Sequence, residues 1–122
     1  MWINFVLVGI LCLLFFLHVL ILFKAIPYHM VWGSRLKTDR DMYRFEVASL
    51  LISLIFIWLT LEASEMIAGV LPASWNAPIF LVLAAFFALN TLGNFTSQNK
   101  LEKWGFGFMT LLITAACIYL AL

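Results

Sequence analysis

The stretch KAIPYHMVWGSRLKTDRDMYRFE, residues Lys24–Glu46, is the only long polar interval in this sequence. The whole chain is 66% hydrophobic, and only 11% of all residues are charged. A soluble domain of this composition would have too little polar surface to cover it, so the membrane is the expected solvent. The interval also holds five of the seven basic residues, namely Lys24, Arg35, Lys37, Arg40 and Arg44. It therefore decides how the chain is oriented in a bilayer.

Four apolar runs flank this interval and follow it. A membrane-spanning helix needs ~20 mostly apolar residues, because the hydrocarbon core is ~30 Å thick. The predicted spans cover about 2–23, 47–70, 79–95 and 105–122, and they leave little of the 122 residues for anything else. We therefore predict an all-α integral membrane protein with a single domain, 1–122, built as an antiparallel bundle of four transmembrane helices.

The basic residues predict the orientation of this bundle. The two that lie outside the first interval, Lys100 and Lys103, fall in the predicted loop 96–104. By the positive-inside rule, loops 24–46 and 96–104 are cytoplasmic and both termini lie outside. The first apolar run has no preceding positive charge and is too long for a signal peptide, so we interpret it as a span. These features predict a multi-pass protein of the bacterial inner (cytoplasmic) membrane.

Local signals refine the first boundaries. Pro27 stops the first helix shortly after Lys24. Thr38 followed by Asp41 resembles a capping box, which predicts that the second helix begins at about Asp39, before the chain enters the membrane. Pro72 closes the second span.

Each predicted span carries polar residues at a similar depth near the cytoplasmic side. At 1.5 Å per residue, His18 lies about 9 Å from Lys24 along the helix. A polar group in lipid is costly and is expected to face the interior of the bundle. Either these residues join the helices by hydrogen bonds, or they form a buried site for a proton, an ion or a small solute. The predicted intramembrane site consists of His18, Ser49, Ser53, Asn90, Asn94 and Thr110.

Two acids, Glu62 and Glu65, lie at the opposite end of the second span. Their spacing of three would place both on one helical face. One interpretation is an outer acidic rim that attracts cations. The other is that they mark the water-facing end of the span. A cation site would require more ligands than two carboxylates, so we predict no metal site here.

The basic loop has two interpretations as well. Its charges can serve topology and attraction to anionic lipid, at about 1 kcal/mol for each Lys or Arg near the surface. Alternatively, they dock a cytoplasmic protein, since Tyr28, Trp32 and Tyr43 are interleaved with them. The residues concerned are Arg35, Lys37, Arg40 and Arg44. The expected partners are the lipid bilayer and further copies of this chain in a homo-oligomer. Nucleic acid is not expected as a partner.

The sequence does not support an enzyme. Cys12 and Cys117 lie in apolar runs without a C-x-x-C motif, and we interpret them as packing residues. No Ser/His/Asp or Cys/His set is expected to meet at one depth. A haem held by His18 and His29 is disfavoured because His29 lies outside the predicted spans. We therefore expect no cofactor.

Three segments resemble parts of small bacterial four-span membrane proteins: LHVLILFK from Leu17, VWGSRLKTDRDMYRFE from Val31 and LNTLGNFTSQNKLEK from Leu89. The size and layout are similar to those of small fluoride channels and small multidrug transporters. The glycine-rich pore motifs of the former are absent. The first span also has His18 in place of the membrane-embedded glutamate of the latter. The chain is assigned to neither family.

Two function classes follow. The first is an oligomeric channel or a transporter of small solutes or ions, with its polar site in the inner leaflet. The second is a non-enzymatic membrane assembly or regulatory protein that binds a partner through the basic loop. The two differ in whether the polar residues converge around a cavity or pair one to one.

Overall fold

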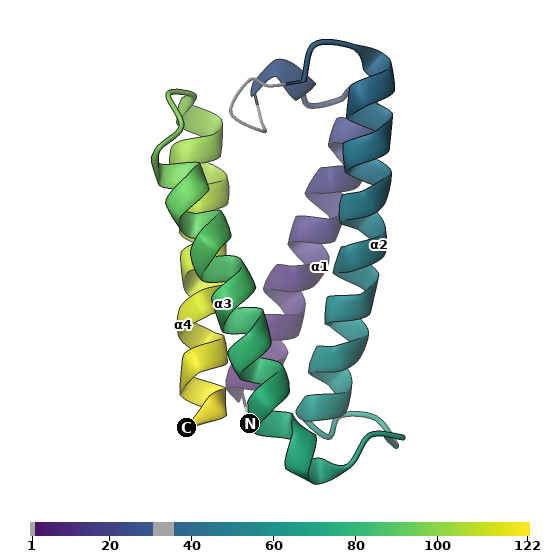
Figure 1. The fold of residues 1–122 in the computed structure, drawn as a ribbon, viewed down its shortest axis with the longest axis vertical. Helices are drawn as coiled ribbons and strands as arrows, with labels where there is room; N and C mark the ends of the chain where they lie inside the picture. Colours follow the sequence, from purple (N-terminus) through teal and green to yellow (C-terminus); the bar gives the residue numbers. More distant parts are fainter. Residues whose placement is uncertain (1, 31–35) are drawn as a thin grey trace.

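The computed structural model describes residues 2–30 and 36–122, and these residues form helices and turns but no strand. Four helices are long and apolar enough to cross a membrane, with short helical extensions before the last two (Figure 1). They are α1 (Trp2–Leu22), α2 (Asp39–Ala63), α3 (Asn76–Phe95) and α4 (Gly107–Ala121). The prediction of an all-helical chain with four membrane-type helices is confirmed.

The first connection follows the predicted boundaries. Lys24 adopts a left-handed conformation, with φ at 65°, directly after α1. Such a residue commonly ends a helix. The predicted start of α2 is also confirmed, because the Thr38 hydroxyl accepts a hydrogen bond from the Asp41 backbone N–H at 3.2 Å.

The end of α2 differs from the sequence prediction. The helix ends at Ala63, well before the expected boundary at Val70. Glu65 has a φ of 58°, and the N–H of Met66 reaches back to the carbonyl of Leu61 at 3.0 Å. A left-handed residue with this bonding pattern closes a helix, and Pro72 lies too far along the chain to do so.

The helical segments that lead into α3 and α4 begin earlier in the sequence than the expected spans. A 3₁₀ turn, Ala73–Trp75, leads directly into α3 at Asn76. A π-helical segment, η4 (Leu101–Phe106), leads into α4, so much of the expected loop 96–104 is helical. Its wider turns place Glu102 and Phe106 in the protein interior.

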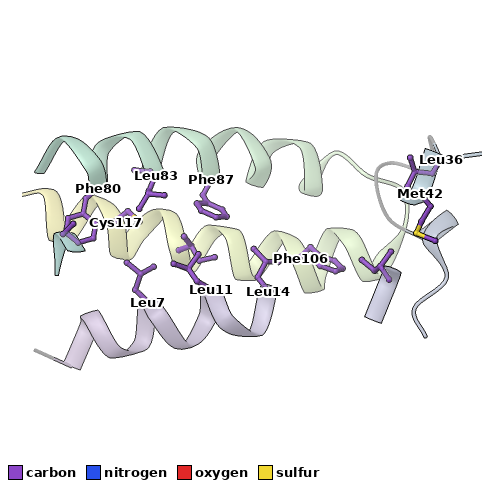
Figure 2. Close-up of a cluster of buried hydrophobic side chains, with 14 residues drawn as sticks. Leu7, Leu11, Leu14, Leu36, Met42, Phe80, Leu83, Phe87, Phe106 and Cys117 are labelled. Carbon is purple, nitrogen blue, oxygen red and sulfur yellow. The ribbon is translucent and has the colours of Figure 1, made fainter. Parts of the chain in front are cut away.

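The helices are arranged as two pairs. In Figure 1, α1 lies beside α2 and α3 lies beside α4, and the two chain termini are at the same end. Apolar side chains join the pairs in the half that contains the termini. Figure 2 shows Leu7 and Leu11 of α1 directed toward α4, and Leu83 and Phe87 of α3 directed toward it from the other side. Leu7, Leu83, Ile113 and Cys117 are at most 1% exposed, so this half is closely packed.

Candidate functional site

A cavity of about 500 Å³ occupies the other half of the molecule. Its walls come from the later part of α1, the earlier part of α2, the later part of α3, and η4 with the start of α4. It therefore lies toward the two connections that carry the basic residues. The volume is within the range of small-molecule sites in proteins, ~300–1,000 Å³. All residues of the predicted intramembrane site line this cavity: His18, Ser49, Ser53, Asn90, Asn94 and Thr110.

His18 and Glu46 form the most polar contact of this region. The His18 Nδ1 atom lies 2.6 Å from Glu46 Oε2, which joins α1 to α2. The Glu46 side chain is completely buried, whereas His18 keeps 16% of its side chain exposed and lines the cavity. When the carboxylate is ionised, Nδ1 carries the proton and donates it to this bond, so the carboxylate orients the ring. A short bond of this kind is charge-assisted and stronger than a neutral one.

A second polar group joins α3 to α4. The Thr91 hydroxyl donates to Thr110 Oγ1 at 3.0 Å, and the Asn94 amide donates to the same oxygen at 3.3 Å. Asn90 instead donates its amide N–H to the carbonyl of Phe86, one turn back on its own helix, at 2.9 Å. The predicted layer thus divides into the pair His18–Glu46 and a hydroxyl–amide network, with the cavity between them.

Ser49 and Ser53 lie on α2 and face the same cavity as three phenylalanine rings. Both side chains are half-buried and line the cavity. Phe56, Phe86 and Phe87 form an aromatic wall, with edge-to-face contacts between ring centroids 4.8 to 5.7 Å apart. The cavity is therefore amphipathic, because uncharged hydrogen-bonding groups and apolar rings face the same space.

Sequence reasoning missed two acids of this site. Glu46 lies on the same face of α2 as Ser49 and Ser53, three and seven residues earlier, but it was expected in a cytoplasmic loop. Glu102 lines the cavity and is 5% exposed. It stands eight residues before Thr110, with Phe106 between them at the helical spacing. In both cases the signal was a polar face that continues past the expected end of the membrane span.

The predicted outer acidic rim is not formed as expected. Glu62 is only 5% exposed, and its two carboxylate oxygens accept hydrogen bonds from the N–H groups of Val70 (2.9 Å) and Leu71 (3.5 Å). Gly69 approaches the same carboxylate so closely that an added Cβ atom would collide with Oε2. Glu65 is exposed and lies beyond the helix end. The two acids do not share a helical face, because α2 ends between them.

The basic loop is described only in part. Lys37, Arg40 and Arg44 are exposed, and Arg35 lies outside the described residues, as does Trp32. Lys24 donates to Asp39 at 2.6 Å, and this hydrogen bond raises the pKa of Lys24 above its ordinary value. The Tyr28 hydroxyl donates to the same carboxylate at 2.9 Å, which raises the pKa of Tyr28 as well. The start of α2 is thereby tied to the end of α1.

The His, Cys, Asp and Glu side chains are spread out over residues 2–30 and 36–122. No group of three or more His, Cys, Asp and Glu side chains is gathered there. Cys12 and Cys117 are both free thiols, the first exposed and the second buried. His29 is exposed in a 3₁₀ turn, away from the four long helices.

Comparison with protein-family models, with curated proteins and with solved structures gave no match for this chain. What the site can do must therefore be inferred from its own geometry.

Proposed function

We propose that the chain is a small transporter of solutes or ions in the bacterial inner membrane. In this proposal the helices form an antiparallel bundle with both termini outside, and the cavity opens to the cytoplasm. The observation that supports it is the convergence of polar groups from all four helices on one cavity of about 500 Å³. Helix-joining residues alone would pair off without leaving such a space.

The packed half of the molecule favours a carrier over an open channel. A channel requires a continuous polar path, whereas Leu7, Leu83 and Ile113 fill the space beyond the aromatic wall. A cavity that is open on one side and closed on the other is typical of one state of an alternating-access transporter. The two helical pairs are the units that would move against each other. A homo-oligomer remains part of this proposal, and chemical cross-linking in vesicles would test it.

The pair His18–Glu46 would couple transport to protons. An imidazole can accept and release a proton, and the Glu46 carboxylate lies within hydrogen-bonding distance to share it. Buried ionisable groups inside a membrane are costly and are commonly part of a proton or ion pathway. Protonation of the pair would change the charge of the cavity wall and hence the affinity for a solute.

The test is proton and ion flux in proteoliposomes of checked orientation, with a pH-sensitive dye inside. We expect flux with the wild-type protein, none with His18→Ala, and wild-type flux with His29→Ala. His29→Ala is the matched control, because it makes the same chemical change outside the cavity. Full flux in His18→Ala would refute the role of the pair.

The alternative function is partner binding through the basic loop, which the exposure of Lys37, Arg40 and Arg44 favours. This alternative predicts no flux with the wild-type protein or with the His18→Ala variant. It also predicts that a cytoplasmic protein co-purifies with the wild type and is lost when Lys37 and Arg40 are changed to Glu. Simple attraction to anionic lipid would instead give no co-purifying protein.

A further inference from the structure

A further set of polar residues lies at the helix ends of the packed half, in the first turn of α1 and the last turn of α2. Three side-chain oxygens there are buried and form no hydrogen bond with the described residues: Asn4 Oδ1, Thr60 Oγ1 and Ser64 Oγ. The Thr60 side chain is completely buried. Most buried polar atoms in proteins have a partner, so three orphan oxygens in one region call for an explanation.

Thr60 differs from the other buried threonines. The Thr110 and Thr114 hydroxyls each donate to the carbonyl four residues back on their own helix, at 2.9 and 2.8 Å. The Thr91 hydroxyl shares its single proton between the Phe87 carbonyl, at 2.7 Å, and Thr110 Oγ1, at 3.0 Å. This local bond is the ordinary way to satisfy a hydroxyl inside a membrane helix. The Thr60 hydroxyl does not make it, so its oxygen is left for another ligand.

The helix register brings the three oxygens to one level. His18 contacts Glu46 and Lys24 contacts Asp39, so residue numbers rise along α1 as they fall along α2. Fourteen residues are close to four helical turns. Asn4 lies that far before His18, and Thr60 lies that far after Glu46. The two therefore lie at the same level along the helix pair, and Ser64 lies one turn beyond Thr60.

The surroundings favour a cation. Every Lys and Arg of the sequence lies in segments 24–44 and 100–103, so this end of the helix pair has no basic side chain. The site is at the carboxyl end of α2, where the helix dipole attracts positive charge. The carbonyls of Thr60, Leu61 and Glu62 each accept a backbone hydrogen bond there and keep a second lone pair for a ligand. The buried Glu62 carboxylate belongs to the same helix end. Ends of helices in membrane transporters commonly bind sodium through carbonyl and hydroxyl oxygens.

We propose that a sodium ion binds between the outer ends of α1 and α2, held by the oxygens of Asn4, Thr60 and Ser64. These oxygens are neutral, and the Glu62 carboxylate is already engaged with backbone amides. That donor set suits a monovalent ion better than a divalent one, which prefers several carboxylates. Carbonyls of the last turn of α2 would complete the coordination. This site does not depend on the transport function proposed above.

The test is thermal unfolding of the purified protein in detergent, followed by tryptophan fluorescence. NaCl is titrated against choline chloride at constant ionic strength, and KCl is titrated in parallel. A ligand that binds only the folded state raises Tm in a saturable way. We expect such a rise with sodium, a smaller one with potassium and none with choline.

Variants connect the response to the residues. Thr60→Val keeps the side-chain shape and removes the oxygen, so the sodium response should fall at least tenfold in apparent affinity. In choline the same variant should be as stable as the wild type or more stable, because an unpaired buried hydroxyl is removed. Thr114→Val is the matched control and should keep the full response. If Thr60→Val does not fold, Ser64→Ala is read in the same way.

Equal Tm values in sodium, potassium and choline would overturn the proposal and leave water as the occupant. An undiminished sodium response in Thr60→Val and Ser64→Ala would overturn it as well. Because no step of the measurement involves transport, its failure is separate from a failure of the flux experiment.

Discussion

The two halves of the molecule differ in what fills the space between the helices. Toward the termini, side chains such as Leu7, Leu83 and Ile113 are buried to within 1% and fill the space. Toward the basic connections, the same four helices enclose a cavity lined by His18, Asn94 and other polar groups. Since close packing is the ordinary state of protein interiors, the half that departs from it is the half to examine for function.

The largest expected effect on stability comes from the packed half. Leu83→Ala should lower the free energy of unfolding by about 3 kcal/mol, because it leaves a void among buried side chains. Leu89→Ala is the control on the same helix. Leu89 lines the cavity and is 72% exposed, so its truncation should cost less than about 1 kcal/mol. Denaturant unfolding in mixed micelles measures both, and equal losses would contradict the division into a packed half and a hollow half.

The next effect concerns the hydrogen bond between His18 and Glu46 at the edge of the cavity. His18→Leu removes a hydrogen-bond partner of the buried Glu46 side chain and should cost about 2 kcal/mol. His29→Leu, in the exposed 3₁₀ turn, should cost less than His18→Leu. In the double variant His18→Leu/Glu46→Leu, much of the loss should return, since the buried carboxyl group is gone as well. Strictly additive losses in this double-mutant cycle would show that the two side chains are not coupled.

Some features of the fold and the site could be predicted from local sequence, and others could not. Hydrophobic run length located all four helices, and the Thr38–Asp41 signal located the start of α2. Depth counted along the spans selected the six residues that now line one cavity. These features depend on local sequence and on the constant rise of a helix.

The remaining features depend on the tertiary structure. The partner of His18 was not predicted. Glu46 ends a charged stretch of the sequence, and that stretch was assigned to a cytoplasmic loop. Glu102 was not predicted, because a π-helical segment replaces the expected turn. The early end of α2 depends on a left-handed Glu65 and on a carboxylate that binds amides eight and nine residues away. No hydropathy pattern encodes such contacts.

A smaller effect is expected for the hydroxyl–amide network. Thr110→Val removes the acceptor shared by Thr91 and Asn94 and should cost roughly 0.6 kcal/mol, the average for hydrogen bonds between membrane helices. Thr114→Val removes only a bond within its own helix and should cost less. The comparison requires unfolding measurements under identical micelle conditions. A larger loss for Thr114→Val would mean that the interhelical bonds contribute little.

The smallest expected effect is at the connection between α1 and α2. The hydrogen bond to Asp39 raises the pKa of Lys24 above its ordinary 10.5 in the folded state. Its contribution is therefore fully present below pH 10.5 and is lost as pH rises through the higher folded value. The contact is exposed, so we expect only a slight additional fall in Tm at alkaline pH, absent in Lys24→Met. An identical alkaline profile in that variant would assign the fall to other groups.

The one-sided cavity can be tested most directly by the accessibility of Ser53 to water. Ser53→Cys is treated with a membrane-impermeant maleimide in inside-out and in right-side-out vesicles, and the unsubstituted protein gives the background labelling of Cys12 and Cys117. We expect labelling above background in inside-out vesicles alone, with none for Leu11→Cys in either orientation. Labelling of Ser53→Cys from the outside, or from neither side, would contradict a hydrated cavity that opens to the cytoplasm.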